Sequence, residues 1–316
     1  MRVGVLTSGG DAPGMNAAIR AVVRAALVKG YEVFGIYDGY KGLVEGNIKQ
    51  FTRTDVSETL NKGGTVLGTA RLPEFTQESV RQRAVDQLKK YDIDCLITIG
   101  GDGTYQGANA LTNMGIKCIG LPGTIDNDIA STDYTIGFST ALNTAVDAID
   151  KLRDTSSSHQ RCSIIEIMGR DCGDLSIFAG ICCGAEYVIT KETGFDKEKL
   201  LNSLREERRN GRKHAIVVVA ENITDVHKLA KEVEDYSEYE CRATVLGYIQ
   251  RGGIPTPEDR LLASRMGVYA VDLLEEGVGG VAVGVINNKM TYSPFSDALK
   301  MTKETRGILS IVKKIQ

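Results

Sequence analysis

The sequence predicts an α/β protein made of two similar three-layer lobes, each with a mostly parallel sheet, and an active site in the cleft between them. Short β-branched runs alternate with helical stretches along the chain, which is the pattern of a parallel sheet covered by helices. A chain of 316 residues usually divides into two lobes. The second half repeats the alternation without any short repeat, which favours two similar lobes over a solenoid.

The short runs rich in β-branched residues are expected to form the strands. They are residues 2–7, 32–37, 95–99, 117–121, 162–168, 215–220, 243–246 and 281–286. Ligands of open α/β sheets bind beyond the carboxyl ends of the strands. The loops that follow these strands should therefore hold the functional site.

Two helices can be predicted from the spacing of apolar residues. In residues 16–29 the apolar positions follow i, i+3, i+4, i+7 and i+8, at Ile19, Val22, Val23, Ala26 and Leu27. Gly30 follows as a stop signal. A similar stripe in residues 138–154 consists of Leu142, Ala145, Val146, Ile149 and Leu152. The polar residues 155–158 predict the end of this helix, and a lobe boundary should lie near it.

The composition is that of a folded globular protein, with 42% hydrophobic and 25% charged residues and a net charge of -3. This charge argues against nucleic acid or an anionic membrane as a partner held by bulk electrostatics. No long apolar segment occurs, so we expect a cytoplasmic protein. The seven cysteines show no CxxC spacing and no neighbouring histidines, so we expect reduced thiols and neither a zinc site nor a disulfide framework.

Two glycine-rich loops that follow predicted strands are candidates for binding phosphate. Residues 8–14, Ser-Gly-Gly-Asp-Ala-Pro-Gly, lead into the first helix, whose free N–H groups and dipole attract anions. The alternative for this loop alone is a tight turn that needs positive φ. Residues 100–104, Gly-Gly-Asp-Gly-Thr, place an aspartate among glycines, which suits a nucleotide whose Mg²⁺ is held by few protein oxygens. The sequence has no Walker loop.

A third loop, residues 122–128, carries Asp126 and Asp128 two positions apart, on one side if the chain is extended there. A carboxylate near an attacking hydroxyl can take its proton during phosphoryl transfer, and Asp126 is the predicted base. A simple turn is the alternative interpretation of an Asp-Asn-Asp cluster. Three such loops in one chain favour a site over three unrelated turns.

Together with Met168-Gly169-Arg170 and residues 247–253, Gly-Tyr-Ile-Gln-Arg-Gly-Gly, these loops resemble the signature motifs of bacterial ATP-dependent 6-phosphofructokinases. The resemblance covers nearly the whole chain except its C-terminal end. It implies the phosphofructokinase fold, with an ATP-binding lobe in residues 1–138 and about 252–301. The sugar-phosphate-binding lobe would comprise residues 139–251 and about 302–316.

The resemblance also implies a reaction, in which the γ-phosphoryl group of ATP passes to the 1-hydroxyl of fructose 6-phosphate in glycolysis. Mg²⁺ would be held by Asp102, and Asp126 would deprotonate the hydroxyl. Thr124 and Arg170 would steady the reacting groups, and Arg71 would offset charge on the transferred group. The residues implied to contact ATP are Gly10, Arg71, Leu72, Gly101, Asp102, Gly103 and Thr104. Those implied to contact the sugar phosphate are Thr124, Ile125, Asp126, Arg161, Met168, Gly169, Arg170, Glu221, Arg242, Tyr248, Ile249, Gln250 and Arg251.

The family also implies a homotetramer whose active sites are shared between subunits. Arg161 and Arg242 would reach the sugar phosphate of a neighbouring subunit. Tyr248 stands where many relatives have a histidine beside the sugar phosphate. A tyrosine donates a hydrogen bond but carries no positive charge, so substrate affinity should depend less on pH near neutrality.

Bacterial members of the family have an effector site for ADP or phosphoenolpyruvate. The matching residues here are Arg20, Ala21, Val22, Val23, Arg24, Arg53, Glu58, Arg153, Gly184, Ala185, Glu186, Arg212, Lys213 and His214. Arg20 and Arg24 lie one helical turn apart and repel one another unless an anion or solvent lies near them. Asn210 and Arg212 stand where related proteins carry lysine, so we expect weakened regulation.

Two alternative functions are weighed against this one. Pyrophosphate-dependent members of the family usually have aspartate in place of Gly103 and lysine in place of Gly123, so glycine at both positions favours ATP. The chain could also be an inactive, effector-binding subunit of a larger kinase assembly. Intact Asp102, Asp126 and Arg170 argue against that second alternative.

Overall fold

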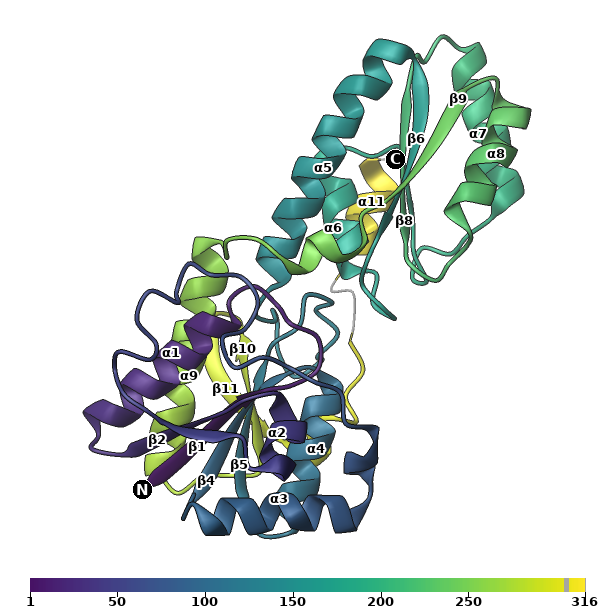
Figure 1. The fold of residues 1–316 in the computed structure, drawn as a ribbon. Helices are drawn as coiled ribbons and strands as arrows, with labels where there is room; N and C mark the ends of the chain where they lie inside the picture. The colour runs from purple at the N-terminus through teal and green to yellow at the C-terminus, as the bar shows by residue number, and fades with distance from the viewer. Residues whose placement is uncertain (304–306, 316) are drawn as a thin grey trace. The chain divides into compact units, whose positions relative to one another are not determined.

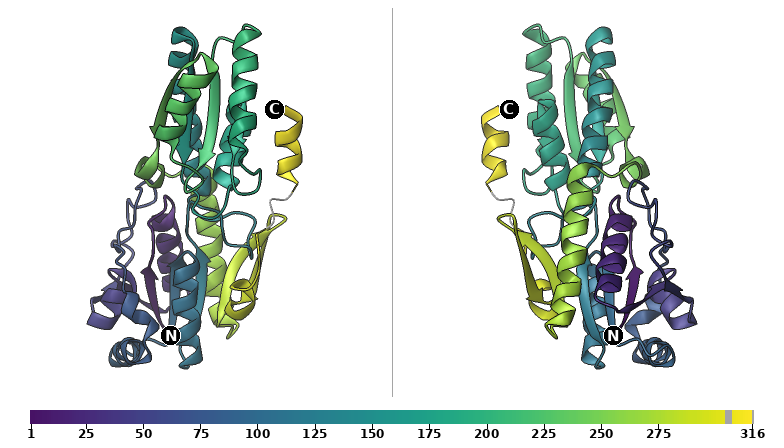
Figure 2. Two further views of the ribbon diagram at one scale, coloured as in Figure 1. Left: turned by 90° about the vertical axis from the view of Figure 1, so that its right-hand side faces the viewer. Right: turned by 90° about the vertical axis from the view of Figure 1, so that its left-hand side faces the viewer.

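The computed structural model describes residues 1–303 and 307–315 and divides the chain into two compact units. Unit 1 comprises Met1–Thr140 and Arg251–Lys303, and unit 2 comprises Ala141–Gln250 with the C-terminal segment. Figure 1 colours the chain by residue number, and Figure 2 gives two further views. The assignment of ATP to the first unit and of the sugar phosphate to the second stays a prediction.

Unit 1 is built on a seven-stranded sheet with the strand order β11-β10-β5-β4-β1-β2-β3. Its strands are β1 (Arg2–Thr7), β2 (Glu32–Ile36), β3 (Ile48–Phe51), β4 (Cys95–Gly100), β5 (Lys117–Pro122), β10 (Val281–Ile286) and β11 (Lys289–Pro294). The central strands pair in parallel, and the edge strands β3 and β11 are antiparallel to their neighbours. The predicted mostly parallel sheet is confirmed for this unit.

Helices cover both faces of the sheet of unit 1 (Figure 1). They are α1 (Met15–Val28), α2 (Gly39–Glu45), α3 (Glu78–Lys90), α4 (Asp102–Asn113), α9 (Pro257–Glu275), α10 (Phe295–Ala298) and the short η1 (Pro73–Thr76). On one face Leu6 and Leu96 of the sheet share an apolar cluster with Leu88 of α3. On the other face α1 packs against α9. That close approach requires Gly267, since a β-carbon there would lie 2.7 Å from Cβ of Ala21.

Unit 2 contains a four-stranded sheet in the order β7-β8-β6-β9, and every pair in it is parallel. Its strands are β6 (Arg161–Ile167), β7 (Tyr187–Ile189), β8 (Ala215–Ala220) and β9 (Glu240–Val245). Its helices are α5 (Phe138–His159), whose first turn belongs to unit 1, α6 (Asp174–Cys183), α7 (Lys197–Arg209), α8 (Val226–Ser237), η2 (Gly247–Arg251), whose last residue belongs to unit 1, and α11 (Ile308–Ile315). α7 and α8 cover one face, and α5 and α6 cover the other (Figure 1). The three-layer arrangement is therefore present in both units.

Every predicted strand has a counterpart in the structure, with small shifts at the ends. Three strands were missed, namely β3, β7 and β11. β7 has only 3 residues, and β3 and β11 are edge strands that expose polar side chains. None of them forms the longer β-branched run that a buried strand shows.

The predicted end of a helix at residues 155–158 is wrong, because α5 continues through them to His159. Serine favours a break when its hydroxyl competes for backbone groups. Here Ser156 and Ser158 donate instead to carbonyl oxygens one turn back in the same helix, at 2.7 and 3.0 Å. Ser156 also pairs with Ser163 of β6 at 2.6 Å. This polar turn is thus tied to the sheet and stays helical.

The seven cysteines carry thiols rather than disulfides, and five of them are buried. Burial raises the pKa of Cys95 and of Cys118 to about 12. Because the thiolate is the reactive form of cysteine, these two side chains act as small apolar residues of the core.

None of the helices within residues 1–303 and 307–315 has the length and apolar character needed to span a membrane.

Candidate functional site

The three glycine-rich loops emerge side by side at one edge of the sheet of unit 1. β4 pairs with β1 and with β5, and the register places Thr7 opposite Ile99 and Gly100 opposite Pro122. The loops after these strands therefore begin level with one another. From β1 the chain adds β2 and β3 in one direction, and from β4 it adds β5 and β10 in the other. β1 and β4 thus flank the switch point at which open α/β sheets bind ligands.

The loop after β1 is held by side chains of neighbouring segments. Thr104 of α4 donates to the carbonyl oxygen of Ser8 at 3.0 Å. Thr69 donates to the carbonyl oxygen of Gly9 at 2.7 Å. Gly9 and Gly14 have φ of 84° and 106°, the positive values that a tight turn requires. The turn and a backbone without side chains beside it therefore occur together in this loop. The loop is fixed from both sides while Gly9 stays exposed.

Two predicted arginines bring positive charge to this edge of unit 1. Arg71 is exposed and follows Thr69, which anchors its segment, by two residues. The adjacent Leu72 is half-buried and packs against the apolar cluster of unit 1. A β-carbon at Gly10 would lie 3.6 Å from Cζ of Arg251. Gly10, which is predicted to contact ATP, and Arg251, which is predicted to contact the sugar phosphate, are therefore neighbours.

Asp102 is the first residue of α4, where the helix dipole favours negative charge. Its Oδ2 accepts a hydrogen bond from Gln106 at 2.8 Å. The buried Tyr40 donates to the carbonyl oxygen of Thr104 at 2.6 Å and so fixes this turn from within the core. A β-carbon at Gly103 would meet no atom within 4 Å. The carboxylate therefore lies beside open space on a rigid turn.

The chemistry around Asp102 fits a magnesium ion that arrives with a nucleotide. Residues 1–303 and 307–315 contain no group of three or more side chains that could hold a metal ion by themselves. Mg²⁺ is often bound by one or two carboxylates together with phosphate oxygens and water. A single carboxylate beside uncrowded glycines meets that requirement.

The loop that carries Asp126 is paired with the segment just before α5. Gly123 forms a bridge with Ile136, and the N–H of Thr124 donates to the carbonyl oxygen of Ile136 at 3.1 Å. The hydroxyl of Thr124 accepts a hydrogen bond from the N–H of Asp126 at 3.2 Å. Ile125 is buried, whereas Asp126 is half-buried. This loop also adjoins the previous one, since a β-carbon at Gly101 would lie 3.8 Å from Cβ of Thr124.

Asn127 locks the Asp126 loop from inside. Its side chain is 1% exposed, and its Oδ1 accepts a hydrogen bond from the N–H of Thr135 at 3.1 Å. Its φ is 53°, a left-handed conformation that asparagine tolerates better than most residues. The chain is therefore bent between Asp126 and Asp128, and the extended arrangement considered for these two carboxylates does not occur.

In unit 2 a group of predicted sugar-phosphate residues lies at the carboxyl edge of the sheet. Residues 168–170 follow β6, and Glu221 follows the neighbouring strand β8. Oε1 of Glu221 accepts hydrogen bonds from the N–H groups of Gly169 and Arg170 at 3.0 and 2.6 Å. Burial, followed by the charge of Glu221, raises the pKa of Glu166 in β6. Glu221 thus holds the loop that presents Arg170, whose side chain is exposed.

The η2 turn presents two further predicted residues on the surface of unit 2. Tyr248 and Ile249 are 76% and 60% exposed. Gln250 is buried instead, and its amide donates to the carbonyl oxygen of Gly247 at 3.1 Å. Tyr248 and Ile249 can therefore meet a ligand directly, whereas Gln250 shapes the turn.

Arg161 and Arg242 lie at the opposite edge of the same sheet. Arg161 begins β6, and Arg242 is near the beginning of β9, so both are at the amino ends of strands. At about 3.3 Å per residue, Arg161 lies roughly 20 Å along β6 from Ile167, the last strand residue before the Arg170 loop, and Arg242, which is level with Ser163, lies roughly 13 Å from the same edge. Glu240 lies between the two arginines, with oxygens 2.8 Å from Nε of Arg161 and 2.5 Å from Nη2 of Arg242. The close contact with Arg161 lowers the pKa of Glu240.

The predicted effector residues of unit 1 form a positive patch. The charge of Arg20, followed by burial and the charge of Arg53, lowers the pKa of Arg24. Nε of Arg24 is buried and has no hydrogen-bond partner among the described residues. The side chains of residues 21–23 are buried, so within this stretch the two arginines are left to face a ligand. Glu58 is exposed.

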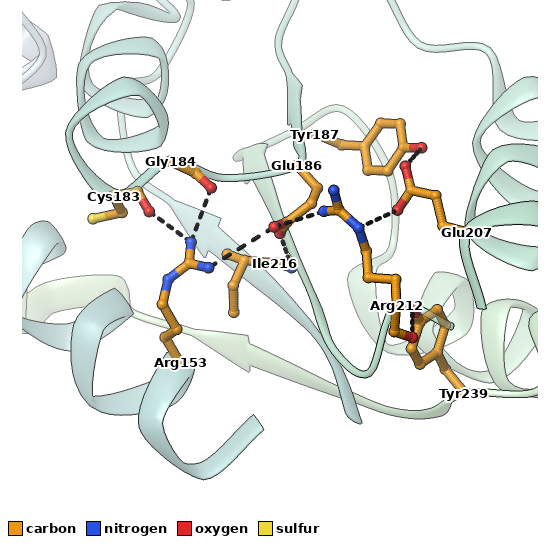
Figure 3. A network of polar contacts seen from close by, with 9 residues as sticks. All are labelled: Arg153, Cys183, Gly184, Glu186, Tyr187, Glu207, Arg212, Ile216 and Tyr239. Atoms are coloured by element: carbon orange, nitrogen blue, oxygen red, sulfur yellow. Dashed lines mark hydrogen bonds and ion pairs between the residues drawn. The ribbon is translucent and has the colours of Figure 1, made fainter. Parts of the chain in front are cut away.

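The predicted effector residues of unit 2 are tied into a network of arginines and glutamates (Figure 3). Oε1 of Glu186 lies 2.9 Å from Nη1 of Arg212 and 3.9 Å from Nη1 of Arg153. Nε of Arg212 lies 3.4 Å from Oε2 of Glu207. Arg153 also donates to the carbonyl oxygens of residues 183 and 184, where α6 ends. The positive charges of Arg153 and Arg212 are therefore already balanced by carboxylates of the chain.

Tyr187 extends this network to the far side of Glu207. Its hydroxyl donates to Oε1 of Glu207 at 2.9 Å, and burial, followed by that contact, raises the pKa of Tyr187. Of the remaining predicted residues, Ala185 is buried, Lys213 is exposed and His214 is half-buried.

Sequence reasoning missed several side chains that hold the predicted residues in place. They are Tyr40, Asn127, Glu207 and Glu240. Asn127 could have been found, because an asparagine between two aspartates often marks a residue with positive φ. Tyr40 acts on Thr104, far along the chain, and nothing in its local sequence indicates it. Glu207 and Glu240 lie within a few residues of Arg212 and Arg242, but the local sequence does not show which glutamates form these pairs.

The fold is that of an α/β protein with glycine loops at the switch point of one sheet and arginines at sheet edges, an arrangement typical of proteins that bind phosphate groups. A family model described as Phosphofructokinase matches residues 2–274, and the chain belongs to this family. An ATP-dependent 6-phosphofructokinase of Photobacterium profundum is 60% identical over 302 residues, which cover 96% of this chain and 94% of the relative. A protein of the same name from Aliivibrio salmonicida is 61% identical over 299 residues, 95% and 93% of the two chains.

Solved structures of the family share the fold. The phosphofructokinase of Saccharomyces cerevisiae matches with a TM-score of 0.87 and 33% identity over 99% of this chain, which spans 47% of the yeast chain. A pyrophosphate-dependent phosphofructokinase from Marinobacter aquaeolei matches with a TM-score of 0.85 and 20% identity, covering 96% of this chain and 85% of the other. The predicted family and fold class are confirmed.

Asn127→Gly should lower kcat about tenfold or more, because the residue keeps its left-handed backbone but loses the hydrogen bond that holds the Asp126 loop. Asn127→Ala should be slower still and less stable, since alanine adds backbone strain at positive φ. Steady-state kinetics and thermal unfolding of both variants check this. A kcat for Asn127→Gly equal to that of the wild type would contradict it.

Proposed function

We propose that this chain is an ATP-dependent 6-phosphofructokinase of glycolysis that acts in the cytoplasm. It transfers the γ-phosphoryl group of ATP to the 1-hydroxyl of fructose 6-phosphate and yields fructose 1,6-bisphosphate and ADP. The observation that carries the proposal is the 60% identity, over 96% of the chain, to a curated protein of that name. The glycine loops at the switch point of unit 1 support it, since phosphates need bare backbone beside them.

Asp126 is the proposed base that takes the proton of the sugar hydroxyl. The N–H of Asp126 donates to the hydroxyl of Thr124, so the residue proposed to steady the reacting groups also orients the base. Arg71 is proposed to offset the charge on the transferred phosphoryl group, and Arg170, like Thr124, is proposed to steady the reacting groups. These residues do little covalent chemistry, and their contribution is placement and charge.

Mg²⁺ is the proposed cofactor, and Asp102 is its proposed protein ligand. When bound with ATP, the ion neutralises phosphate charge and orients the group to be transferred. The bond from Gln106 holds Asp102 at the start of α4, and the glycines on either side leave room for the phosphates. The other residues proposed for the nucleotide are Gly10, Arg71, Leu72, Gly101, Gly103 and Thr104.

The sugar phosphate is proposed to bind at a site shared between subunits of a homotetramer. Arg161 and Arg242 lie near the amino ends of their strands in the unit 2 sheet, roughly 20 and 13 Å along the strands from the edge that presents Arg170, so a sugar phosphate bound at Arg170 would lie far from both arginines of the same chain. A second subunit that supplies Arg161 and Arg242 removes this difficulty. Tyr248 and Arg251 would complete the phosphate contacts, and Glu221 would bind sugar hydroxyls while it holds the Arg170 loop.

An anionic effector, ADP or phosphoenolpyruvate, is proposed to bind the arginines of the effector set. The buried Nε of Arg24 supports the proposal, because an unbonded buried donor is costly unless a ligand accepts from it. In unit 2 the effector would have to displace Glu186 or Glu207 from Arg212. That competition, together with the replacements at Asn210 and Arg212, supports a weakened response.

The alternative functions have less support. The pyrophosphate-dependent relative shares 20% identity, against 60% for a relative named as ATP-dependent. An inactive effector-binding subunit would not need Asp102, Asp126 and Arg170 on well-anchored loops.

The donor and the base are tested by steady-state phosphorylation of fructose 6-phosphate with Mg²⁺, using ATP or pyrophosphate. We expect turnover with ATP alone, lowered about a hundredfold or more in Asp126→Ser, because the proton acceptor is removed. Turnover with pyrophosphate would contradict the choice of donor. No turnover with either donor would favour the regulatory-subunit alternative.

Gly103→Asp should raise the KM for ATP about tenfold or more, because a second carboxylate beside Asp102 repels the phosphates. The open space around Gly103 predicts that folding is unaffected, and thermal unfolding checks this. Gly103→Asn is the matched control, since it adds the same bulk without charge. Equal KM values for the two variants would show that bulk, and not charge, decides.

Tyr248→His should make the affinity for fructose 6-phosphate depend on pH, whereas the wild type should change little between pH 6 and 8. A histidine near its ordinary pKa is positive at pH 6 and attracts the phosphate, and it loses this charge as the pH rises. The KM of the variant should therefore rise by about threefold more than that of the wild type over this range. Equal slopes for the two proteins would contradict the prediction.

A further inference from the structure

Asp259 of α9 is a buried carboxylate that the proposed chemistry does not use. It is 1% exposed, and neutral N–H and O–H groups donate to its two oxygens. Its Oδ1 accepts from the N–H of Gly137 at 2.8 Å. Its Oδ2 accepts from the N–H and the hydroxyl of Thr140 at 2.7 and 2.5 Å. The carboxylate is thus satisfied by donors from the first turn of α5.

The first turns of α5 and α9 cap one another through this contact. The hydroxyl of Thr140, which donates to Asp259, also accepts from the N–H of Thr256 at 3.0 Å. The hydroxyl of Thr256 accepts from the N–H of Asp259 and pairs with Ser139. In an ordinary capping box an acidic residue at this position bonds back to its own helix. Here Asp259 bonds to another helix, and Thr140 takes its place.

The contact lies directly beneath two loops of the candidate site. Gly137 follows Ile136, which pairs with Gly123 and Thr124 at the start of the Asp126 loop. A β-carbon at Gly14, at the end of the loop after β1, would lie 2.8 Å from Cγ2 of Ile136 and 3.4 Å from Cβ of Asp259. A shift of Gly137 would therefore move both loops.

We propose that Asp259 is a positioning residue for phosphoryl transfer, which fixes the Asp126 loop against the loop after β1 through Gly137 and Thr140. The proposal rests on the proposed function, since it assigns Asp126 as the base. Asp259 itself touches no substrate. Its effect is on where Asp126 lies, and a small displacement of a catalytic group slows a reaction strongly while binding is largely retained.

The test compares kcat, both KM values and thermal unfolding for Asp259→Asn and Thr140→Val in the full chain. Asparagine keeps the shape of aspartate but replaces one acceptor oxygen by an NH2 group, which cannot accept from the N–H donors of Gly137 or Thr140. The value of kcat should therefore fall about tenfold or more, while the KM for ATP should change by about twofold at most. Thr140→Val removes one donor and should lower kcat by about threefold or more, and Thr140→Ser should restore it.

Two controls separate positioning from stability. Glu258→Gln removes a charge from the same helical turn at an exposed position and should leave the kinetics unchanged. Leu88→Ala, in the core of unit 1, should lower the unfolding temperature without lowering kcat at temperatures well below unfolding.

If Asp259→Asn and Thr140→Val lose stability but keep kcat, as Leu88→Ala does, the proposal is overturned and Asp259 is only structural. If Asp259→Asn does not fold, Thr140→Val and Thr140→Ser decide the question alone. A wild-type chain without turnover would instead overturn the proposed function.

Discussion

The parallel pairing of β4 with β1 and with β5 is the constraint on which the candidate site of unit 1 depends. It starts three loops at the same level of one sheet edge, but it does not fix their conformation. Buried polar side chains do that. Thr104 and Asn127 belong to the loops themselves, whereas Tyr40 and Asp259 come from other parts of the chain. Each is a polar group with its hydrogen bonds satisfied in the core, where loss of a partner is costly.

Much of the fold and the positions of the three glycine-containing loops could be predicted from the sequence, because buried strands and glycine loops have local signals. The strands of the two sheet centres were found, and the fold class followed from their alternation with helices. The continuation of α5 past residue 154 was missed, since Ser156 is kept helical by Ser163, a residue of the next strand. Glu240 was missed as a partner of Arg161 for the same reason, since a charge pair between separate elements leaves no mark on the neighbouring sequence.

The arginines of the two units differ in how their charge is balanced. In unit 2 Arg153, Arg161, Arg212 and Arg242 each contact a glutamate, so a phosphate would exchange one anion for another. Replacing a glutamate by a phosphate beside the same arginine gains little free energy. A ligand that makes further contacts would therefore be favoured over a simple anion. In unit 1 the neighbours of Arg24 are other arginines, and an arriving anion would relieve their repulsion. The free energy of binding an anion would thus have a different physical origin in each unit.

Unit 1 consists of two segments that are separated in the sequence by most of unit 2, and this affects the order in which its sheet can form during synthesis. β10 pairs with β5 through Val281 and Ile119, which lie far apart in sequence, and all the strands of unit 2 are synthesised between them. At ribosomal rates that interval lasts roughly 10–30 s, during which β5 is an uncovered edge. The sheet of unit 2 can form in that time, because its strands come from one uninterrupted segment. A chaperone that shields exposed strand edges should therefore bind a nascent chain that ends between β5 and β10, and release it once α9 and β10 have emerged.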